Sequence, residues 1–341
     1  EPVACGWEVC LTANFETAQR GLIPSTLMAP LSATDEVTVA AALHSIPQLA
    51  QLDPGQLEIT RLGGLTNLVY RVVPPDGAPL CLRVPGEGTS AYIDRDAERV
   101  NMIVAANAGV APAVLHFGSD GVMLMPLLPG DTMSPSVFAT KAGAIARAGG
   151  ALRRLHASGE VFAAKFELFE QIDKYLKELG DDAELPEGYH ETLETAQGVR
   201  LALAARLLPT APCHCDPLCE NFIDDDGRGC MWIVDFEYGG MNDPMWDLGD
   251  FCVEAALDAE RERELFAAYF GPKAPTAVER GRVVLYKAMC DLLWTLWGLL
   301  QHKNGNPAED FWSYSLERFA RCQKLMAEPT FAEYVAVVRA G

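Results

Sequence analysis

Apolar residues occur in short runs over the first part of the chain and then recur with helical spacing. Short runs bounded by turn residues predict strands. These runs occupy residues 57–62, 68–73, 80–84, 113–117 and 121–125. Beyond residue 130 apolar positions recur every three or four residues, which predicts helices. The helices are predicted at 137–156, 165–179, 189–208, 248–257, 260–270, 277–301 and 308–326. The pattern therefore predicts an α+β fold with a small strand-rich lobe and a large helical lobe.

The stretch 214–221 reads His-Cys-Asp-Pro-Leu-Cys-Glu-Asn and has the spacing H-x-D-x-x-x-x-N. In such a loop the aspartate, here Asp216, accepts a proton from a substrate hydroxyl, and Asn221 binds Mg²⁺ through its amide oxygen. Asp235, in the tripeptide Asp-Phe-Glu, would bridge the metal to nucleotide phosphates. Because Mg²⁺ keeps several waters, Asn221 and Asp235 suffice as protein ligands. The spacing predicts a phosphotransferase site that uses ATP and Mg²⁺.

Two short apolar runs, 221–223 and 230–235, flank a turn rich in Asp and Gly at 224–229. We expect a hairpin that folds Asp235 back beside Asn221. His214 taken alone is more often structural than catalytic. Asp247, farther along the chain, is expected to accept hydrogen bonds from buried backbone donors near the catalytic loop.

The run 233–244, Ile-Val-Asp-Phe-Glu-Tyr-Gly-Gly-Met-Asn-Asp-Pro, resembles the signature of the choline/ethanolamine kinase family. The resemblance is to its bacterial branch, within the wider group that includes the aminoglycoside phosphotransferases, and it covers roughly residues 56 to 320. It implies a protein-kinase-like, two-lobed fold with ATP bound between the lobes. The expected division is a segment of unknown role at 1–35, a nucleotide-binding lobe at 36–128 and a catalytic, substrate-binding lobe at 129–341.

The resemblance also implies a set of residues that bind the nucleotide. The Gly-Gly-Leu-Thr-Asn stretch at 63–67 resembles the family's nucleotide loop, where glycine lets the backbone approach phosphates. Arg83 and Glu98 resemble the basic strand residue and the helix glutamate that pair in kinases, although an exposed strand end and a solvated helix face are the simpler alternatives. In this family the backbone near the interlobe hinge binds adenine, though core residues are equally expected there. The candidates are Gly64, Thr66, Asn67, Arg83, Glu98, Met125 and Leu127.

Trp294 and Trp297 are three residues apart on one predicted helix, a pattern that is usually core. The run 293–301 resembles the helix that carries the choline-binding tryptophans of choline kinases; Tyr314 resembles the third aromatic of that pocket and Glu254 its acid. A trimethylammonium group donates no N–H hydrogen bond, so ring faces must recognise it. Ethanolamine would require more acceptors. The expected activity is choline kinase, with ethanolamine, another amino alcohol or a silent choline-binding protein as alternatives.

The formal net charge of −20 argues against nucleic acid and anionic membranes as partners and favours a cationic substrate. Ten cysteines in a chain of this length are expected to be reduced thiols of a cytoplasmic protein. Zinc at Cys213, Cys215 and Cys219 is disfavoured, because their spacing lacks paired C-x-x-C units. The most apolar segment, 283–300, contains Lys287 and Asp291 and predicts a buried helix rather than a membrane span.

Overall fold

The computed structural model describes residues 31–63, 67–75, 77–86 and 93–341. Gly64 and Thr66 lie outside the described residues. By internal contacts the chain divides into two compact units, residues 1–133 together with 220–238, and residues 134–219 together with 239–341. The first boundary therefore lies after residue 133, whereas the expected lobes divide after residue 128. The hairpin that contains Asn221 and Asp235 belongs to the first unit.

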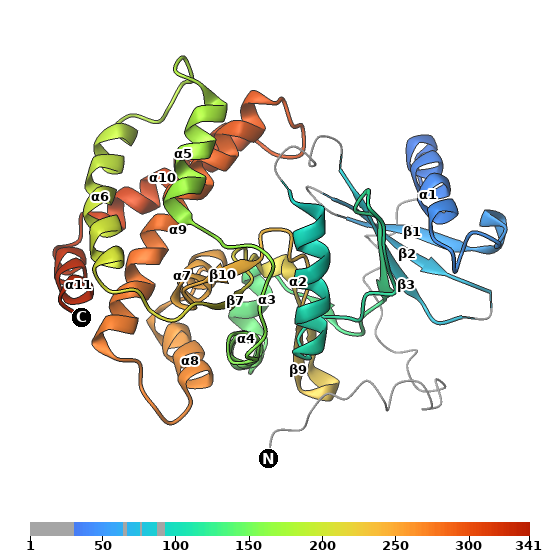
Figure 1. The fold of residues 1–341 in the computed structure, drawn as a ribbon, viewed down its shortest axis with the longest axis horizontal. Helices are drawn as coiled ribbons and strands as arrows, with labels where there is room; N and C mark the ends of the chain where they lie inside the picture. The colour runs from blue at the N-terminus through green and yellow to red at the C-terminus, as the bar shows by residue number, and fades with distance from the viewer. Residues whose placement is uncertain (1–30, 64–66, 76, 87–92) are drawn as a thin grey trace. The chain divides into compact units, whose positions relative to one another are not determined.

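A five-stranded antiparallel sheet forms the first unit, with strand order β1-β2-β3-β5-β4 (Figure 1). The predicted strands are confirmed, with slightly different ends. Their bounds are β1 (Glu58–Gly63), β2 (Asn67–Val73), β3 (Leu80–Pro85), β4 (His116–Phe117) and β5 (Met123–Pro126). The side chains of Tyr70, Val72 and Leu82 are fully buried, since alternate residues of a strand point to the same face.

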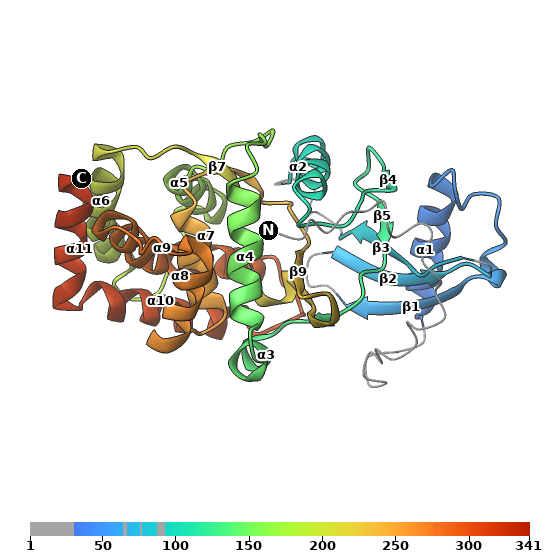
Figure 2. The same ribbon diagram turned by 90° about the horizontal axis from the view of Figure 1, so that it is seen from below.

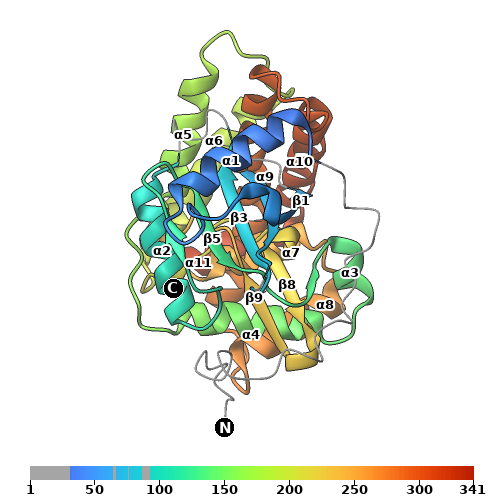
Figure 3. The same cartoon turned by 90° about the vertical axis from the view of Figure 1, so that its right-hand side faces the viewer.

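Helix α1 (Ala33–Ser45) lies across this sheet (Figure 3) and buries Val39 and Leu43 in the same apolar cluster as the strands. Its first turn carries a capping box, in which Ser32 and Asp35 satisfy each other's backbone N–H groups. Asp35 also accepts hydrogen bonds from Tyr70 at 2.6 Å and Arg61 at 2.7 Å. The apolar pattern did not predict α1, because the helix is weakly amphipathic and is held by these contacts with the sheet.

The first unit also contains helix α2 (Arg95–Asn107) and a second, three-stranded sheet. That sheet has the order β6-β8-β9, with β6 (Asp131–Thr132), β8 (Phe222–Asp225) and β9 (Cys230–Ile233). The strands β8 and β9 are the predicted hairpin, paired so that Phe222 faces Ile233. The Ile233 N–H donates to the Val110 carbonyl at 2.8 Å, which ties the hairpin to the segment after α2.

The second unit is mainly helical, and its long helix α9 packs against α5, α6, α7, α10 and α11. Helix α4 packs against α8 (Figure 2). The helices are α3 (Pro135–Thr140), α4 (Ala144–His156), α5 (Leu168–Leu179), α6 (Tyr189–Ala205), α7 (Met245–Glu254), α8 (Ala259–Phe270), α9 (Ala277–Lys303), α10 (Phe311–Met326) and α11 (Pro329–Ala340). Strands β7 (Ala211–Cys213) and β10 (Gly240–Asn242) form a two-stranded sheet.

Two features of the second unit depart from the predicted helices. The single helix predicted at 137–156 is wrong: the chain forms α3 and α4, separated at Gly143, which adopts a left-handed φ of 71°. Glycine takes this conformation without steric cost, so it can break the helix while the apolar spacing continues. Helix α11 was not predicted.

Helix α9 is, among the described residues, the one helix long and apolar enough to cross a membrane by length and composition. In the fold, 83% of its most apolar 18-residue window is buried. The prediction of a buried core helix at 283–300 is therefore confirmed.

Helices α7 and α9 approach each other closely at Gly249. A Cβ atom built there would lie 2.9 Å from both the Val283 carbonyl oxygen and the Tyr286 Cβ. We expect Gly249→Ala to lower the free energy of unfolding by about 1 to 3 kcal/mol, because packed helices must separate. Chemical denaturation of the wild type and the variant measures this change in the free energy of unfolding.

Gly150, in α4, has no atom within 4 Å of the position that a Cβ would take. Gly150→Ala is the matched control and should raise stability by about 0.5 to 1 kcal/mol through helix propensity. A similar gain for Gly249→Ala would contradict the close packing of α7 on α9.

Candidate active site

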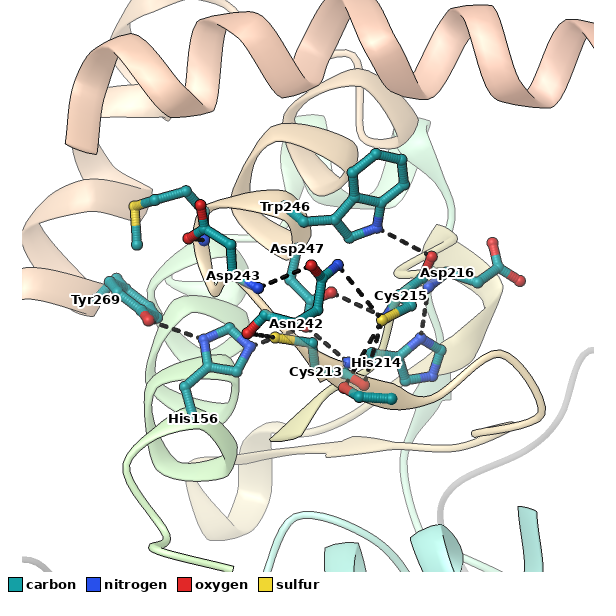
Figure 4. A network of polar contacts seen from close by, with 12 residues as sticks. His156, Cys213, His214, Cys215, Asp216, Asn242, Asp243, Trp246, Asp247 and Tyr269 are labelled. Atoms are coloured by element: carbon teal, nitrogen blue, oxygen red, sulfur yellow. Dashed lines mark hydrogen bonds and ion pairs between the residues drawn. The ribbon is translucent and has the colours of Figure 1, made fainter. Parts of the chain in front are cut away.

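The catalytic loop follows β7 and is held by one carboxylate from α7. The backbone N–H groups of His214 and Cys215 donate to Asp247 at 2.8 and 2.9 Å, and the Trp246 indole N–H donates to the Cys215 carbonyl at 3.1 Å (Figure 4). Asp247 is fully buried. The prediction that Asp247 accepts from buried backbone donors is therefore confirmed.

Cys215 adopts a φ of 67°, a left-handed conformation that costs a non-glycine residue about 1 to 3 kcal/mol. Both of its backbone polar groups are fixed by α7, which keeps the loop in this conformation. The next residue, Asp216, donates its N–H to His214 Nδ1 at 3.3 Å. Figure 4 shows the Asp216 carboxylate directed away from this network. His214 thus supports the loop, in agreement with the expectation that this residue alone is more often structural than catalytic.

His156 supports Asp247 from the other side. One ring nitrogen lies 2.8 Å from Asp247 and the other 2.8 Å from the Tyr269 hydroxyl. The ligand atoms of His156, Cys213 and Asp247 lie within 4.8 Å of one another, yet His156 and Asp247 already make these hydrogen bonds. Burial raises the pKa of the Cys213 and Cys215 thiols well above the ordinary value. The thiolates that zinc requires are therefore disfavoured in the described loop.

In the first unit, the β8–β9 hairpin brings Asn221 and Asp235 together. The Val234 N–H donates to the Asn221 carbonyl at 2.9 Å, which confirms the predicted geometry. Asp235 itself has a φ of 65°, so the chain turns sharply there. Strained residues of this kind are concentrated at functional sites.

Arg83 joins Asp235 to Glu98. Its guanidinium lies 2.7 Å from Asp235 Oδ1 and forms a second ion pair with Glu98. The predicted pairing of Arg83 with Glu98 is confirmed, and both are buried rather than exposed. Burial alone would lower the Arg83 pKa, but Glu98, Asp235 and Glu237 raise it overall. Arg83 therefore stays cationic.

Three further residues close a ring of alternating partners. Arg95 lies 2.7 Å from Glu98 and 3.2 Å from Glu237. The Asn67 amide donates to Glu237 at 3.1 Å and to Asp235 at 3.4 Å. We call these six residues the charge ring, Asn67, Arg83, Arg95, Glu98, Asp235 and Glu237. Arg95 and Glu237 were not predicted as site residues, although Glu237 completes the Asp-Phe-Glu tripeptide.

The charge ring has the donor chemistry that magnesium needs. Carboxylate oxygens of Glu98, Asp235 and Glu237 lie within 4.8 Å of one another, and Mg²⁺ prefers such hard oxygen ligands. Burial, followed by the charge of Asp235, raises the pKa of Glu237 to about 7. Concentrated carboxylates that disfavour each other's ionisation are stabilised by a bound cation.

The predicted adenine-binding stretch lies at the end of β5. Met125 is buried and pairs with Cys81 in the sheet. The Leu127 N–H donates to the Pro79 carbonyl at 3.0 Å. A ligand at Leu127 would therefore meet the carbonyl oxygen rather than the N–H group.

In the second unit, aromatic rings from α9 and α10 pack together. The ring centroids of Trp294 and Trp297 are 6.5 Å apart, and those of Trp297 and Tyr314 are 5.9 Å apart. The structure thus brings together the three aromatics predicted from the sequence. Trp294 is almost fully buried, whereas Trp297 and Tyr314 are partly exposed.

Two carboxylates one helical turn apart on α7 lie beside these rings. The Trp294 indole N–H donates to Asp250 at 3.5 Å, and Glu254 forms an ion pair with Arg318 at 2.6 Å. Burial, then Glu254 and Asp216, raise the pKa of Asp250 well above its ordinary value. Asp250 was not predicted, although its i,i+4 spacing from Glu254 was a signal. We call Asp250, Glu254, Trp294, Trp297 and Tyr314 the aromatic-acid cluster.

Comparisons with known proteins agree with these motifs. Residues 58–283 match the family described as phosphotransferase enzymes. The crystal structure of a choline/ethanolamine kinase family protein from Mesorhizobium loti is 54% identical, covers 90% of this chain and 99% of its own, and superposes with a TM-score of 0.80. The chain belongs to the choline/ethanolamine kinase family.

Curated relatives of this family member carry two different names. Protein LicA of Haemophilus influenzae is 26% identical over 294 residues, which are 84% of this chain and 81% of the relative. Ethanolamine kinase 2 of Rattus norvegicus is 26% identical over 312 residues, with 82% and 79% covered. The fold is the α+β, protein-kinase-like fold expected from the sequence.

The raised pKa of Glu237 makes the stability of this kinase family member depend on pH. The native Glu237 pKa of about 7 exceeds the ordinary value of 4.5, so the native state binds a proton more tightly than the unfolded chain. Stability should therefore rise as pH falls from 8 to 5.5, by about 2 kcal/mol from this group. Glu237→Gln should lose that part of the pH dependence.

Denaturation is measured with the nucleotide-free protein in a chelator, so that no metal ion competes for the carboxylates. Asp226→Asn, on the exposed turn after β8, is the control and should keep the wild-type pH dependence. Parallel curves for the wild type and Glu237→Gln would contradict the raised pKa.

Proposed function

We propose that this kinase phosphorylates the hydroxyl of choline with ATP, giving phosphocholine and ADP. The observation that carries the proposal is the aromatic-acid cluster in the unit that holds the catalytic loop. Ring faces attract a quaternary ammonium group, and a buried carboxylate strengthens that attraction. Burial is the largest cause of the raised pKa values of Asp250 and Tyr314. The charge of Asp216 raises both pKa values as well, so Asp216 lies close to both side chains. A bound amino alcohol would then have its cation at the cluster and its hydroxyl toward Asp216.

Asp216 is the base in this mechanism. Its carboxylate orients the choline hydroxyl and accepts its proton as the oxygen attacks the γ-phosphorus, and ADP leaves with the electron pair of the broken bond. Magnesium, when bound, neutralises the charge of the phosphates. Asn221 and Asp235 would hold that ion. The proximity of these two residues in the hairpin supports their assignment.

Residues of the first unit would bind ATP. Arg83 would place positive charge beside the phosphates, and Glu98 would hold the Arg83 guanidinium in place. Asn67, which follows Gly64 and Thr66 of the nucleotide loop, would also bind the nucleotide. Gly64 and Thr66 of that loop remain predictions from the family resemblance. Met125 and Leu127 would contact adenine, with the Leu127 carbonyl accepting from the amino group.

Ethanolamine is the second candidate acceptor, and one observation favours it. Asp250 Oδ1 is buried and accepts no hydrogen bond from any described residue. A primary ammonium group has three N–H donors that could satisfy this oxygen, whereas trimethylammonium has none. ATP consumption measured with choline, ethanolamine and their N-methylated intermediates decides between the two. Equal inactivity with all of them would overturn the proposed function.

Replacement of the base tests the catalytic assignment. Asp216→Asn keeps the side-chain size but removes proton acceptance, so kcat should fall by about 10² to 10⁴. Nucleotide affinity and thermal stability should stay near wild type, because backbone contacts with Asp247 hold the loop. A variant with near wild-type kcat would remove Asp216 from the mechanism.

Replacement of one ring tests the acceptor site. Trp297→Leu keeps an apolar side chain but deletes a π face, so KM for choline should rise about 5- to 30-fold while KM for ATP hardly changes. KM for ethanolamine should rise less. Steady-state kinetics with both amines measure the difference.

Trp312→Leu is the matched control, because Trp312 is also a partly exposed tryptophan and packs against His302 instead. It should leave both KM values unchanged. Equal losses for both amines in Trp297→Leu, or a loss of stability without a change in KM, would assign Trp297 to the core.

A further inference from the structure

A cation of the protein itself lies on one of the rings of the aromatic-acid cluster. The Arg318 guanidinium is 4.7 Å from the Tyr314 ring centroid, a distance at which a cation is attracted to the ring. The same guanidinium lies 2.6 Å from Glu254 and 3.3 Å from Asp291. Arg318 is 6% exposed. A ring face and a carboxylate that could receive a substrate cation are therefore already occupied.

The two carboxylates of α7 differ in what they contact. Glu254 is paired with Arg318, whereas Asp250 Oδ1 has no donor among the described residues. Asp250 is fully buried and lies beside Trp294. The cluster thus contains one filled cation position, at Glu254 and Tyr314, and one buried acidic side chain, Asp250, whose Oδ1 remains for a ligand.

A guanidinium holds its charge at every physiological pH, because its pKa exceeds 12. Burial disfavours the charge of Arg318, but Glu254 first and then other groups raise its pKa overall. A second positive group on a bound substrate would lie near this fixed charge in a poorly solvated site. Specificity often depends on such a repulsive contact as much as on the attractive ones.

We propose that Arg318 is a specificity-determining residue that restricts the acceptor to alcohols with a single cationic group. It fills the position formed by Glu254 and Tyr314, so that only the position at Asp250 and the tryptophans receives a substrate ammonium. This inference rests on the proposed function, because it assumes that the aromatic-acid cluster binds the amine. It predicts rejection of dications independently of their size.

Two probes of equal shape separate charge from size. The first is choline in which one N-methyl group is replaced by a 2-(trimethylammonio)ethyl arm, a permanent dication. The second carries a 3,3-dimethylbutyl arm instead, in which carbon replaces the second nitrogen, and is a monocation. The inhibition constant of each probe against choline is measured in the ATP-dependent reaction. For the wild type the dication should inhibit at least about tenfold more weakly.

Arg318→Gln should reduce this discrimination by about tenfold or more, since Glu254 and the Tyr314 face become available to the second charge. Arg318→Lys retains a charge and should preserve much of the discrimination. Arg321→Gln is the matched control on the same helix. Arg321 also pairs with Asp291, at 2.6 Å, but its side chain is 51% exposed, and the discrimination should stay at the wild-type level.

Loss of Arg318 leaves Glu254 buried without a partner, which can prevent folding. The double variant Arg318→Gln, Glu254→Gln removes both charges of the pair and is therefore measured as well. It too should discriminate less than the wild type, because the repelling charge is gone. Cooperative unfolding shows that a variant is folded, and either variant that passes this check is sufficient for the inhibition measurements.

Four outcomes would overturn the inference: equal inhibition of the wild type by both probes, unchanged discrimination in Arg318→Gln and in the double variant, an equal change in Arg321→Gln, or failure of the dication to inhibit the wild type and both of these Arg318 variants. Failure of the proposed function is distinct, because the wild type would then phosphorylate neither choline nor ethanolamine. In that case, dissociation constants of the two probes, measured by calorimetry, would still show whether the Arg318 variants discriminate between the probes less than the wild type does.

Discussion

The buried carboxylate of Asp247 is the constraint on which the catalytic loop depends. It accepts the N–H groups of His214 and Cys215 and lies against His156. Charge-assisted hydrogen bonds of this kind are about twice as strong as neutral ones, which offsets the strain at Cys215. The loop is thereby fixed before any substrate binds. If Asp216 is the base, as proposed, it would need no reorganisation during proton transfer, and pre-organisation of this kind is a large part of catalytic power.

Each compact unit stabilises buried charge by pairing it. In the first unit the charge ring alternates Arg83 and Arg95 with carboxylates, and in the second Arg318 lies between Glu254 and Asp291. Such pairs contribute little net stability, because desolvation costs about as much as the attraction returns. Their contribution is to fix the orientation of the paired side chains. A guanidinium with two partners has one orientation, and so do the carboxylates that metal and amine are proposed to contact.

The sequence predicted the features that depend on local spacing. The loop 214–221 and the β8–β9 hairpin follow from short motifs, since each motif carries its own turn and ligand chemistry. The pairing of Arg83 with Glu98, which lie on different elements, was expected from the family resemblance rather than from spacing. Arg318 could not be recognised in this way, because its partners Glu254 and Asp291 lie on other helices and only folding brings them together. Asp250 and Arg95 were missed although each has a partner on its own helix, because their contacts with Trp294 and Glu237 are formed only in the folded chain. The break at Gly143 was missed for the opposite reason. There the apolar spacing continues across the turn, and only the backbone conformation interrupts the helix.

A chain with a net charge of −20 attracts cations in general, so its acidity cannot by itself select a substrate. Selection requires that most carboxylates near the site be neutralised and that one remain. Arg318 neutralises Glu254 and shares Asp291 with Arg321, which leaves Asp250 as the carboxylate beside Trp294. The rings then favour a cation without strong hydration, and the remaining oxygen of Asp250 favours one with N–H donors. Under the proposed function, the balance between these two attractions at a single acidic residue would decide between choline and ethanolamine.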